Sequence, residues 1–152
     1  MTGDVLVAGA CLSGLTVAEV LRRKGFEGRL RLVGGEDRPP YDRPPLSKEV
    51  LTGRWPAERA QLRDEARLAS LDAELLLGHR LRRLDLGQRI VELDDGRTLS
   101  FETLVVATGL VPRRLSELPG VSTFRTVDDA LALRRELTRA RRLAVVGAGV
   151  LG

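Results

Sequence analysis

The segment "DVLVAGACLSGLTVAEVLRRKG" (Asp4–Gly25) decides the expected fold. Its first part, Asp4–Gly9, is a short β-branched apolar run of the kind that is buried on both faces of a parallel sheet. After a turn that contains glycine, apolar residues recur at helical spacing, and Gly25 is a helix C-terminal signal. The apolar positions of this helix are Leu15, Val17, Ala18 and Leu21. With a second strand at Arg29–Gly34, the segment predicts a βαβ unit of about 30 residues.

Further along, the hydrophobic period changes. A helix is expected over 60–70 and a third strand over 73–78. From Arg80 apolar and polar residues alternate, which is typical of half-exposed antiparallel strands, and Asp94–Arg97 ("DDGR") predicts a hairpin turn in which Gly96 supplies a positive φ. The alternating segments are 80–86, 89–93 and 98–102. This pattern predicts a small antiparallel meander inserted into a parallel α/β domain.

The last third of the chain returns to the α/β pattern. A buried strand is expected at Thr103–Gly109, an amphipathic helix at 127–140 and another buried strand at Leu143–Val146. Asp128 and Asp129 lie near the positive end of that helix. Gly147, Gly149 and Gly152 then complete a second GxGxxG. Because the sequence stops where the helix after this loop should begin, we expect the chain to be a fragment of a longer protein.

The first glycine loop, "GACLSG" (Gly9–Gly14), has the context of a dinucleotide site. In such Rossmann-like sites the glycines permit a tight turn, a close approach of the backbone to pyrophosphate and close packing of helix on strand. Here Cys11 occupies the middle place. Glu36 follows where a carboxylate can take both ribose hydroxyls. The alternative is an ordinary strand-to-helix turn with Cys11 as a small buried filler.

A second chemistry-bearing stretch is "PPYDRPPLSKEVL" (39–51), which holds four prolines and two cations. Pro44 and Pro45 fix φ near −65°, and we expect them to keep Arg43 extended. Ser47 is expected to cap a short helix that presents Lys48 in its first turn. A rigid backbone of this kind suits an arginine forked onto a diphosphate and a lysine beside a redox ring. The alternative is a proline-rich surface turn with solvated charges.

Composition excludes several classes. Hydrophobic residues make up 43 % and charged residues 30 %, and no apolar stretch approaches the roughly 20 residues that span a membrane. Cys11 is the only cysteine and His79 the only histidine, so we expect no disulfide and no metal site, and the cytoplasm is the default location. The net charge of +4 comes mainly from arginine, but aromatics for base stacking amount to only 3 %. We therefore expect no nucleic-acid partner.

The order of these motifs resembles a known family. "VAGACLSGL", "LVGGE", "YDRPPLSKEVL", "LVVATG", "RTVDDA" and "LAVVGAGVLG" together look like the N-terminal part of the FAD-dependent ferredoxin reductases. These belong to the pyridine-nucleotide-disulfide oxidoreductase superfamily and include putidaredoxin and rubredoxin reductases. The resemblance covers essentially the whole chain. "PPLSK" after the ribose-binding acid is specific to this branch, whereas "ATG" and the two glycine loops are general to the superfamily.

The resemblance implies roles for named residues. Glu36 would hold the adenosine ribose, Arg43 would meet the pyrophosphate, and Lys48 would lie beside the flavin N5 edge as the catalytic cation. Pro45 would also contact the cofactor. Leu81 would contact adenine through its backbone, and Arg125 would lie near the flavin end. The remaining FAD contacts would come from Gly9, Cys11, Ser13, Gly14, Ala107, Thr108 and Gly109. The second loop, with Gly147, Gly149 and Gly152, would open the nicotinamide-dinucleotide domain.

The resemblance also implies a function. Residues 1–114 would form the first segment of an FAD-binding domain, and residues 115–152 the start of an NAD(P)-binding domain. The chain has no cysteine pair, so electrons would pass from NAD(P)H through FAD directly to a ferredoxin-type iron–sulfur protein. The alternatives are the flavin module of a nitrite reductase large subunit or an NADH oxidase-like enzyme, and a flavoprotein resembling apoptosis-inducing factor. NAD and NADP are not distinguished, because the discriminating residue would lie about 20 positions beyond the second loop.

Overall fold

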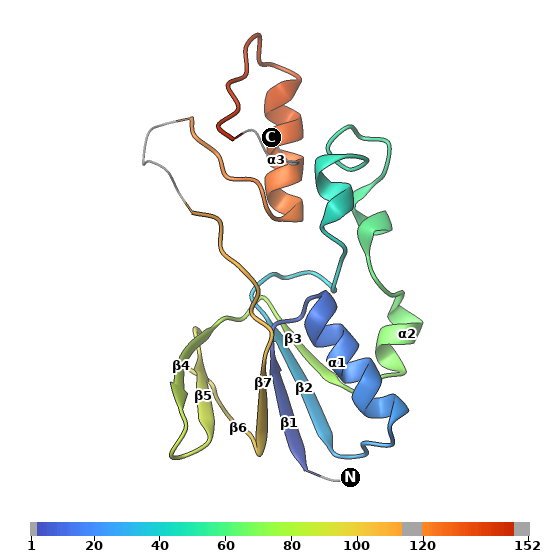
Figure 1. Cartoon of the computed structure of the whole chain (residues 1–152), viewed down its shortest axis with the longest axis vertical. Coiled ribbons are helices and arrows are strands. Elements are labelled where there is room, and N and C mark those ends of the chain that lie inside the picture. Colours follow the sequence, from blue (N-terminus) through green and yellow to red (C-terminus); the bar gives the residue numbers. More distant parts are fainter. Residues whose placement is uncertain (1–2, 114–119, 148–152) are drawn as a thin grey trace. The chain divides into compact units, whose positions relative to one another are not determined.

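The computed structural model describes residues 3–113 and 120–147. The chain divides into two compact units (Figure 1). The first unit comprises Met1–Tyr41 and Leu62–Leu110, and the second comprises Asp42–Gln61 and Val111–Gly152. Each unit is built from two stretches of sequence, so the chain leaves the first unit and returns to it once.

A parallel sheet forms the centre of the first unit, in the strand order β3-β2-β1-β7. Its strands are β1 (Asp4–Ala8), β2 (Arg29–Gly34), β3 (Glu74–Leu77) and β7 (Thr103–Val106). All three pairings are parallel, with Val5 beside both Leu30 and Thr103. This arrangement confirms the βαβ prediction, because β1 and β2 are adjacent and are connected through a helix.

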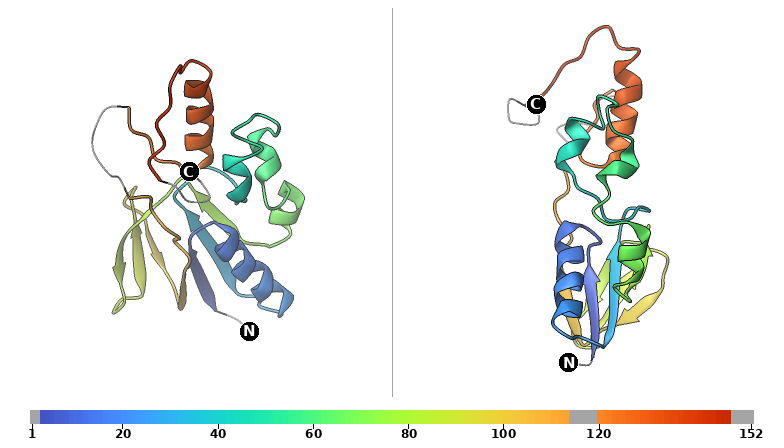
Figure 2. Two further views of the ribbon diagram at one scale, coloured as in Figure 1. Left: turned by 45° about the horizontal axis from the view of Figure 1, so that its top comes forward. Right: turned by 90° about the vertical axis from the view of Figure 1, so that its right-hand side faces the viewer.

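The two faces of this sheet are covered differently (Figures 1 and 2). Val5 and Val7 pack with the helix α1 (Leu12–Arg23), whereas Leu6 packs with the antiparallel strands of the meander. The alternation follows from the strand period of two, which sends successive side chains to opposite faces. Both faces of β1 are therefore buried, as its unbroken apolar run predicts. The short helix α2 (Glu65–Ala69) packs beside α1 through Leu68, which contacts Leu15.

The predicted meander is present. It consists of β4 (Leu81–Asp85), β5 (Ile90–Leu93) and β6 (Thr98–Ser100), paired antiparallel in that order. Gly96 has a φ of 85°, as the hairpin prediction requires. Val91, Leu93 and Phe101 are buried between the meander and the parallel sheet, so the first unit has three layers.

The second unit contains the helix α3 (Val127–Leu137) and the 3-10 turns η1 (Pro44–Ser47) and η2 (Ala57–Ala60). The N-terminus of α3 is fixed by a capping box: the Thr126 hydroxyl accepts from the Asp129 N–H, and the Asp129 carboxylate accepts from the Thr126 N–H. A capping box satisfies two N–H groups that a helix start leaves unpaired. This is why the helix begins at Val127.

Four local predictions were wrong. Only Glu65–Ala69 is α-helical within 60–70, because Asp64 caps a helix that begins later, its side chain accepting from the Arg67 N–H. Arg43 is not extended but helical (φ −84°, ψ −34°), since its carbonyl accepts from the Leu46 N–H at the start of η1. Lys48 accordingly follows a 3-10 turn and does not begin a helix.

The fourth wrong prediction concerns burial of the late strands. Leu143–Val146 is not a strand, and Leu143 and Val146 are 59 % and 78 % exposed. Among the described residues no strand pairs with this segment, so it has no neighbouring strand to hydrogen-bond with and no sheet in which its side chains would be buried. The strand β7 does form, but Val106 is 69 % exposed, because β7 is the outer strand of its sheet.

In residues 3–113 and 120–147, none of the helices has the length and apolarity needed to cross a bilayer.

Candidate nucleotide-binding site

The candidate site of the first unit lies where its parallel strands end. Because the strands are parallel, their carboxyl ends meet at one edge of the sheet, which is where α/β proteins bind ligands. The glycine loop follows β1, Glu36 follows β2, Leu81 comes four residues after β3, and Ala107–Gly109 follow β7. The fold therefore gathers at one edge those predicted residues that belong to this unit.

The glycine loop is packed so closely that its glycines cannot be replaced without a clash. Gly9 has a φ of 126°, and a Cβ placed on it would lie 2.0 Å from the carbonyl oxygen of Ala107. A Cβ on Gly14 would lie 1.9 Å from the carbonyl oxygen of Gly9. Real non-bonded contacts of this kind are above 3 Å. Gly9 thus permits the turn against β7, and Gly14 permits α1 to pack on the strand.

The N-terminus of α1 opens on this edge. Cys11 is its N-cap residue, with an extended backbone and no capping hydrogen bond from its side chain, and the first turn has no acidic residue. Instead the Cys11 thiol donates to the carbonyl oxygen of Ala107, at 3.2 Å. The first N–H groups of a helix have no partner within the helix and carry a partial positive charge. Such a terminus binds anions, phosphate above all.

Glu36 lies two residues beyond β2 and is half-buried. Its backbone is fixed by the Gly78 N–H, which donates to the Glu36 carbonyl at 3.0 Å. The hydroxyl of Tyr41 donates to its carboxylate oxygen Oε2. Sequence reasoning missed Tyr41. The signal that marks it is a lone tyrosine five positions after the candidate acid, directly behind two prolines.

The segment after β3 borders the same edge. The His79 N–H donates to the carbonyl of Gly34 at 2.9 Å, so this segment is joined to the end of β2. The Arg80 side chain lies against Gly35, since a Cβ on Gly35 would lie 3.0 Å from Arg80 Cγ. Leu81, the predicted adenine contact, begins β4 and is half-buried.

The loop after β7 lies against the glycine loop. The Ala107 N–H donates to the carbonyl of Ala8 at 2.7 Å, which extends the β1–β7 pairing by one step. Ala107 is half-buried, while Thr108 and Gly109 are exposed. Gly109 has a φ of 71°, so the chain turns there in a conformation that favours glycine. Ser13, the remaining predicted residue of the first loop, is exposed in the first turn of α1.

The second unit holds the other predicted residues. Arg43 precedes η1, and its Nη1 donates to the carbonyl of Arg125 at 2.8 Å, so two predicted cofactor contacts are joined. The Arg125 N–H donates to the Asp129 carboxylate at 2.9 Å, which ties Arg125 to the start of α3. Lys48 is exposed directly after η1, and Pro45 is half-buried within it.

Of the second glycine loop, only Gly147 lies among the described residues. Its φ of 127° is close to that of Gly9, and nothing lies within 4 Å of a Cβ placed on it. Gly149 and Gly152 lie outside the described residues. The positive φ agrees with the first position of a tight turn, and the packing that distinguishes Gly9 is not repeated at Gly147.

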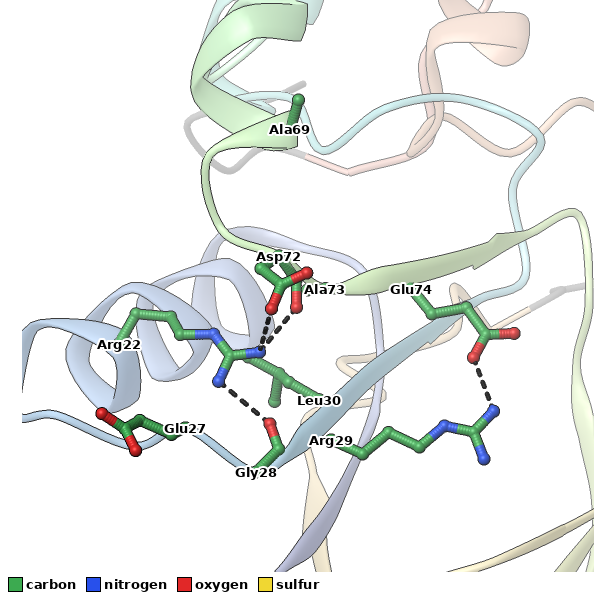
Figure 3. Close-up of a pocket in the computed structure, with 9 residues that line it drawn as sticks. All are labelled: Arg22, Glu27, Gly28, Arg29, Leu30, Ala69, Asp72, Ala73 and Glu74. Atoms are coloured by element: carbon green, nitrogen blue, oxygen red, sulfur yellow. Dashed lines mark hydrogen bonds and ion pairs between the residues drawn. The ribbon is translucent and has the colours of Figure 1, made fainter. Parts of the chain in front are cut away.

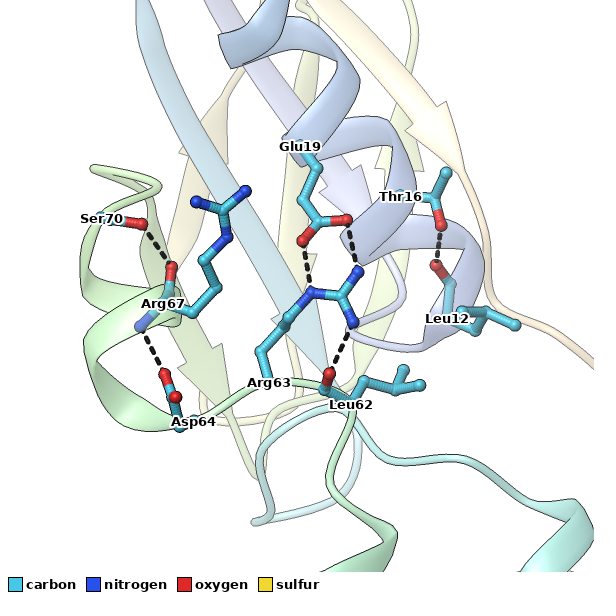
Figure 4. A network of polar contacts seen from close by, with 8 residues as sticks. All are labelled: Leu12, Thr16, Glu19, Leu62, Arg63, Asp64, Arg67 and Ser70. Atoms are coloured by element: carbon cyan, nitrogen blue, oxygen red, sulfur yellow. Dashed lines mark hydrogen bonds and ion pairs between the residues drawn. The ribbon is translucent and has the colours of Figure 1, made fainter.

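Two polar clusters of the first unit lie elsewhere. A shallow hollow is lined by residues at the amino ends of β2 and β3, opposite the glycine-loop edge (Figure 3). There the Arg22 guanidinium donates hydrogen bonds to backbone carbonyls, among them those of Leu71 at 2.7 Å and Phe26 at 2.7 Å. The second cluster joins α1 to the segment that precedes α2, through Glu19 and Arg63 (Figure 4). Both clusters connect segments of the fold.

Residues 3–152 match the family described as pyridine nucleotide-disulphide oxidoreductase. Similar proteins of Pseudomonas putida include two reductases. A benzene 1,2-dioxygenase system ferredoxin–NAD(+) reductase subunit is 39 % identical over all of this chain and 38 % of its own length. A rubredoxin–NAD(+) reductase is 36 % identical over 97 % of this chain and 40 % of its own. A solved covalent putidaredoxin reductase–putidaredoxin complex superimposes with a TM-score of 0.79 at 37 % identity, covering 89 % of this chain and 34 % of that one.

The chain belongs to the pyridine nucleotide-disulphide oxidoreductase family, because the match spans nearly all of its residues. It spans about two fifths of the length of the curated relatives. The likeness to ferredoxin reductases and the α/β fold with its inserted meander, both expected from the motifs, are thereby confirmed.

Proposed function

We propose that this chain provides the first part of the FAD-binding domain of an NAD(P)H-dependent ferredoxin reductase. The enzyme would pass electrons from a nicotinamide coenzyme through FAD to a ferredoxin-type iron–sulfur protein. The observation that carries the proposal is the edge of the parallel sheet. It combines a glycine loop, an uncapped helix N-terminus and a held carboxylate after the next strand, in a chain whose relatives are named as ferredoxin and rubredoxin reductases.

The residues present at this edge fit FAD. Gly9 and Gly14 permit the tight turn and the close helix packing that bring the start of α1 to this edge, where a pyrophosphate can approach its backbone N–H groups. No acidic side chain competes in the first turn of the helix. Glu36 stands at the end of β2, where a carboxylate accepts from ribose hydroxyls. The set therefore offers one anion subsite and one diol subsite, in the order that a dinucleotide requires.

Within the first unit we assign the contacts as follows. The backbone N–H groups from Cys11 to Gly14, including that of Ser13, would bind the pyrophosphate, with Gly9 forming the turn. Glu36 would accept from the adenosine ribose. The Leu81 backbone would contact the adenine. Ala107, Thr108 and Gly109 would line the path of the cofactor, and the thiol bond from Cys11 to Ala107 supports their placement beside the loop.

Within the second unit, Arg43 would contact the pyrophosphate, with Pro45 beside it, and Lys48 would stand beside the flavin ring as a cation that stabilises negative charge there. Arg125 would lie at the flavin end. The bond from Arg43 to the Arg125 carbonyl supports a shared subsite for the two arginines. The exposure of Lys48 supports a role toward a ligand, because an exposed side chain is accessible to a bound cofactor.

FAD, when bound, would supply the acceptance of a hydride and the delivery of single electrons. The chain's own residues bind and orient it and set the charge around it. With Cys11 as the single cysteine, engaged in the first loop, this chain offers no thiol pair as a relay. That is the reason to propose direct transfer to an iron–sulfur partner, the kind of acceptor named for the relatives. We place this activity in the cytoplasm, in keeping with a chain that makes no disulfide framework.

The domain division is also part of the proposal. Residues 1–114 would be the first segment of the FAD-binding domain and residues 115–152 the start of the NAD(P)-binding domain. The positive φ of Gly147 supports a second glycine loop, with Gly149 and Gly152 completing it. This loop would receive the pyrophosphate of the nicotinamide coenzyme.

The test uses the full-length protein. We expect it to purify yellow with non-covalent FAD and to reduce cytochrome c with NADH or NADPH only when a ferredoxin is added. A folded but colourless protein that takes up no FAD would overturn the proposal. Reduction of nitrite, or oxidase activity without ferredoxin, would instead favour the nitrite reductase or NADH oxidase alternative. A bound flavin without any of these activities would favour a flavoprotein that acts through partner binding.

A further inference from the structure

Glu36 and Tyr41, five positions apart in the sequence, face each other across the turn at the end of β2. The Tyr41 hydroxyl donates to Oε2 of the Glu36 carboxylate. Tyr41 is buried, at 9 % exposure, whereas Glu36 is only half-buried. The phenol therefore stands behind the acid, on its protein side, while part of the acid remains open to solvent.

Both backbones of this pair are held. Pro40, directly before the tyrosine, is fully buried, and its carbonyl accepts from the Leu62 N–H at 2.9 Å. On the other side, the Glu36 carbonyl accepts from the Gly78 N–H at 3.0 Å. Proline also fixes its own φ, which limits the paths that the turn can take. The backbone is thus held at Glu36 and at the residue directly before Tyr41.

A fixed phenol matters to a half-exposed glutamate, whose long side chain loses rotamer freedom when a ligand orders it. A donor already bound to one carboxylate oxygen selects a rotamer before the ligand arrives, and preorganisation of this kind improves affinity. The hydroxyl of a buried tyrosine usually finds a hydrogen-bond partner. Here the acceptor is the one carboxylate that stands in the candidate ribose position.

We infer that Tyr41 is a positioning residue for Glu36 and thereby part of the subsite for the adenosine ribose diol. The inference rests on the proposed function, since it takes the diol to be that of FAD. It assigns to the tyrosine of the "PPYDRPP" stretch a role separate from that of the cations that follow it in the sequence. The role is selective: Tyr41 should affect the adenosine half of the cofactor and leave the flavin half alone.

The experiment titrates full-length apoprotein with FAD and, separately, with FMN, which lacks the adenosine ribose. Tyr41→Phe keeps the ring and removes only the hydroxyl. We expect it to weaken FAD binding by about tenfold, the usual effect of losing a hydrogen bond to a charged group, and to leave FMN binding unchanged. Ser70→Ala is the matched control, because it removes a hydroxyl that bonds the Arg67 carbonyl in the same unit. It should change neither affinity.

A double variant separates positioning from packing. If the hydroxyl acts through the carboxylate, Tyr41→Phe should cause no further loss of FAD affinity once Glu36→Ala, which removes the acceptor, is present. If the double variant showed the product of the two single-variant losses in FAD affinity, the two residues would act independently and the inference would be overturned. Unchanged FAD affinity in Tyr41→Phe, an equal loss for FMN, or an apoprotein that no longer folds would also overturn it. Wild-type protein that binds no FAD at all would instead overturn the proposed function on which the inference rests.

Discussion

The thiol of Cys11 donates to the carbonyl oxygen of Ala107 across 3.2 Å, although 96 positions separate the two residues. They belong to the loops that follow β1 and β7, two strands that pair side by side. The Ala107 N–H in turn donates to the Ala8 carbonyl at 2.7 Å. The two loops of the candidate site therefore hold each other in place, and the position of one depends on the packing of the other.

Gly9 is the tightest point of this contact. Gly9→Ala should destabilise the fold by well over the roughly 1–2 kcal/mol that a left-handed backbone alone costs, because the new Cβ would also lie 2.0 Å from the Ala107 oxygen. Gly25→Ala is the matched control, since Gly25 has a φ of 79° and nothing within 4 Å of an added Cβ. Urea unfolding of both variants measures the difference. Equal losses would mean that the loops can move apart.

Arg31 should be a major source of stability. It is 2 % exposed in the middle of β2, and its Nη2 donates to both carboxylate oxygens of Asp4, at 2.8 and 2.6 Å, and to the carbonyl of Ser100 in β6. Arg31→Met leaves Asp4, whose side chain is 21 % exposed, without its partner, so we expect a loss of about 1–3 kcal/mol in the free energy of unfolding.

The control for Arg31 lies two residues away on the same strand. Arg29 is largely exposed and pairs with Glu74 at 2.9 Å, so Arg29→Met should lower the free energy of unfolding by at most about 1 kcal/mol. Denaturant unfolding compares the two variants. Similar losses at the two positions would show that burial does not decide the value of the ion pair.

The Glu19–Arg63 pair makes stability depend on pH. Hydrogen bonding from Arg63 lowers the pKa of Glu19 below its usual 4.5. A carboxyl group whose pKa is lowered by folding stabilises the protein at pH values above its unfolded-state pKa. That contribution is lost as the pH falls through the folded-state pKa. We expect wild type to lose stability relative to Glu19→Gln as the pH falls below about 4.5, measured as urea midpoints at several pH values. Arg63→Met should remove the same dependence, and parallel curves for all three proteins would contradict the assignment.

The two cations of the proline stretch should separate in their effects on the flavin, if the proposed function holds. Lys48→Met in the full-length protein should lower the flavin potential by some tens of millivolts, where about 30 mV corresponds to 1.4 kcal/mol for two electrons, with FAD still bound. Arg43→Met should weaken FAD binding more than it changes the potential. Redox titration and FAD titration measure the two quantities. If the Lys48 variant lost FAD and the remaining flavin kept its potential, the roles assigned to Lys48 and Arg43 would be reversed.

The strands and glycine turns of the first unit could be predicted because their signals are local. The β-branched run of β1, the helical spacing before Gly25 and the "DDGR" turn each specify a backbone within a few residues. The errors arose where local signals were weak or conflicting. Prolines argue for an extended Arg43, but the bond from the Leu46 N–H to its carbonyl keeps it helical. The apolar run Leu143–Val146 looks like a buried strand, yet within the described residues it has no strand to pair with.

The sequence by itself determined the order strand, glycine loop, helix, strand and acid, since that order follows from residues that are neighbours in the chain. Only the tertiary structure decided which polar groups meet. It placed a charged arginine at the centre of β2 against Asp4, a thiol of the first loop on Ala107, and the Tyr41 hydroxyl on Glu36. The physical reason is that a buried polar group needs a partner, and the partner is chosen by which segments the packing of the sheet brings together.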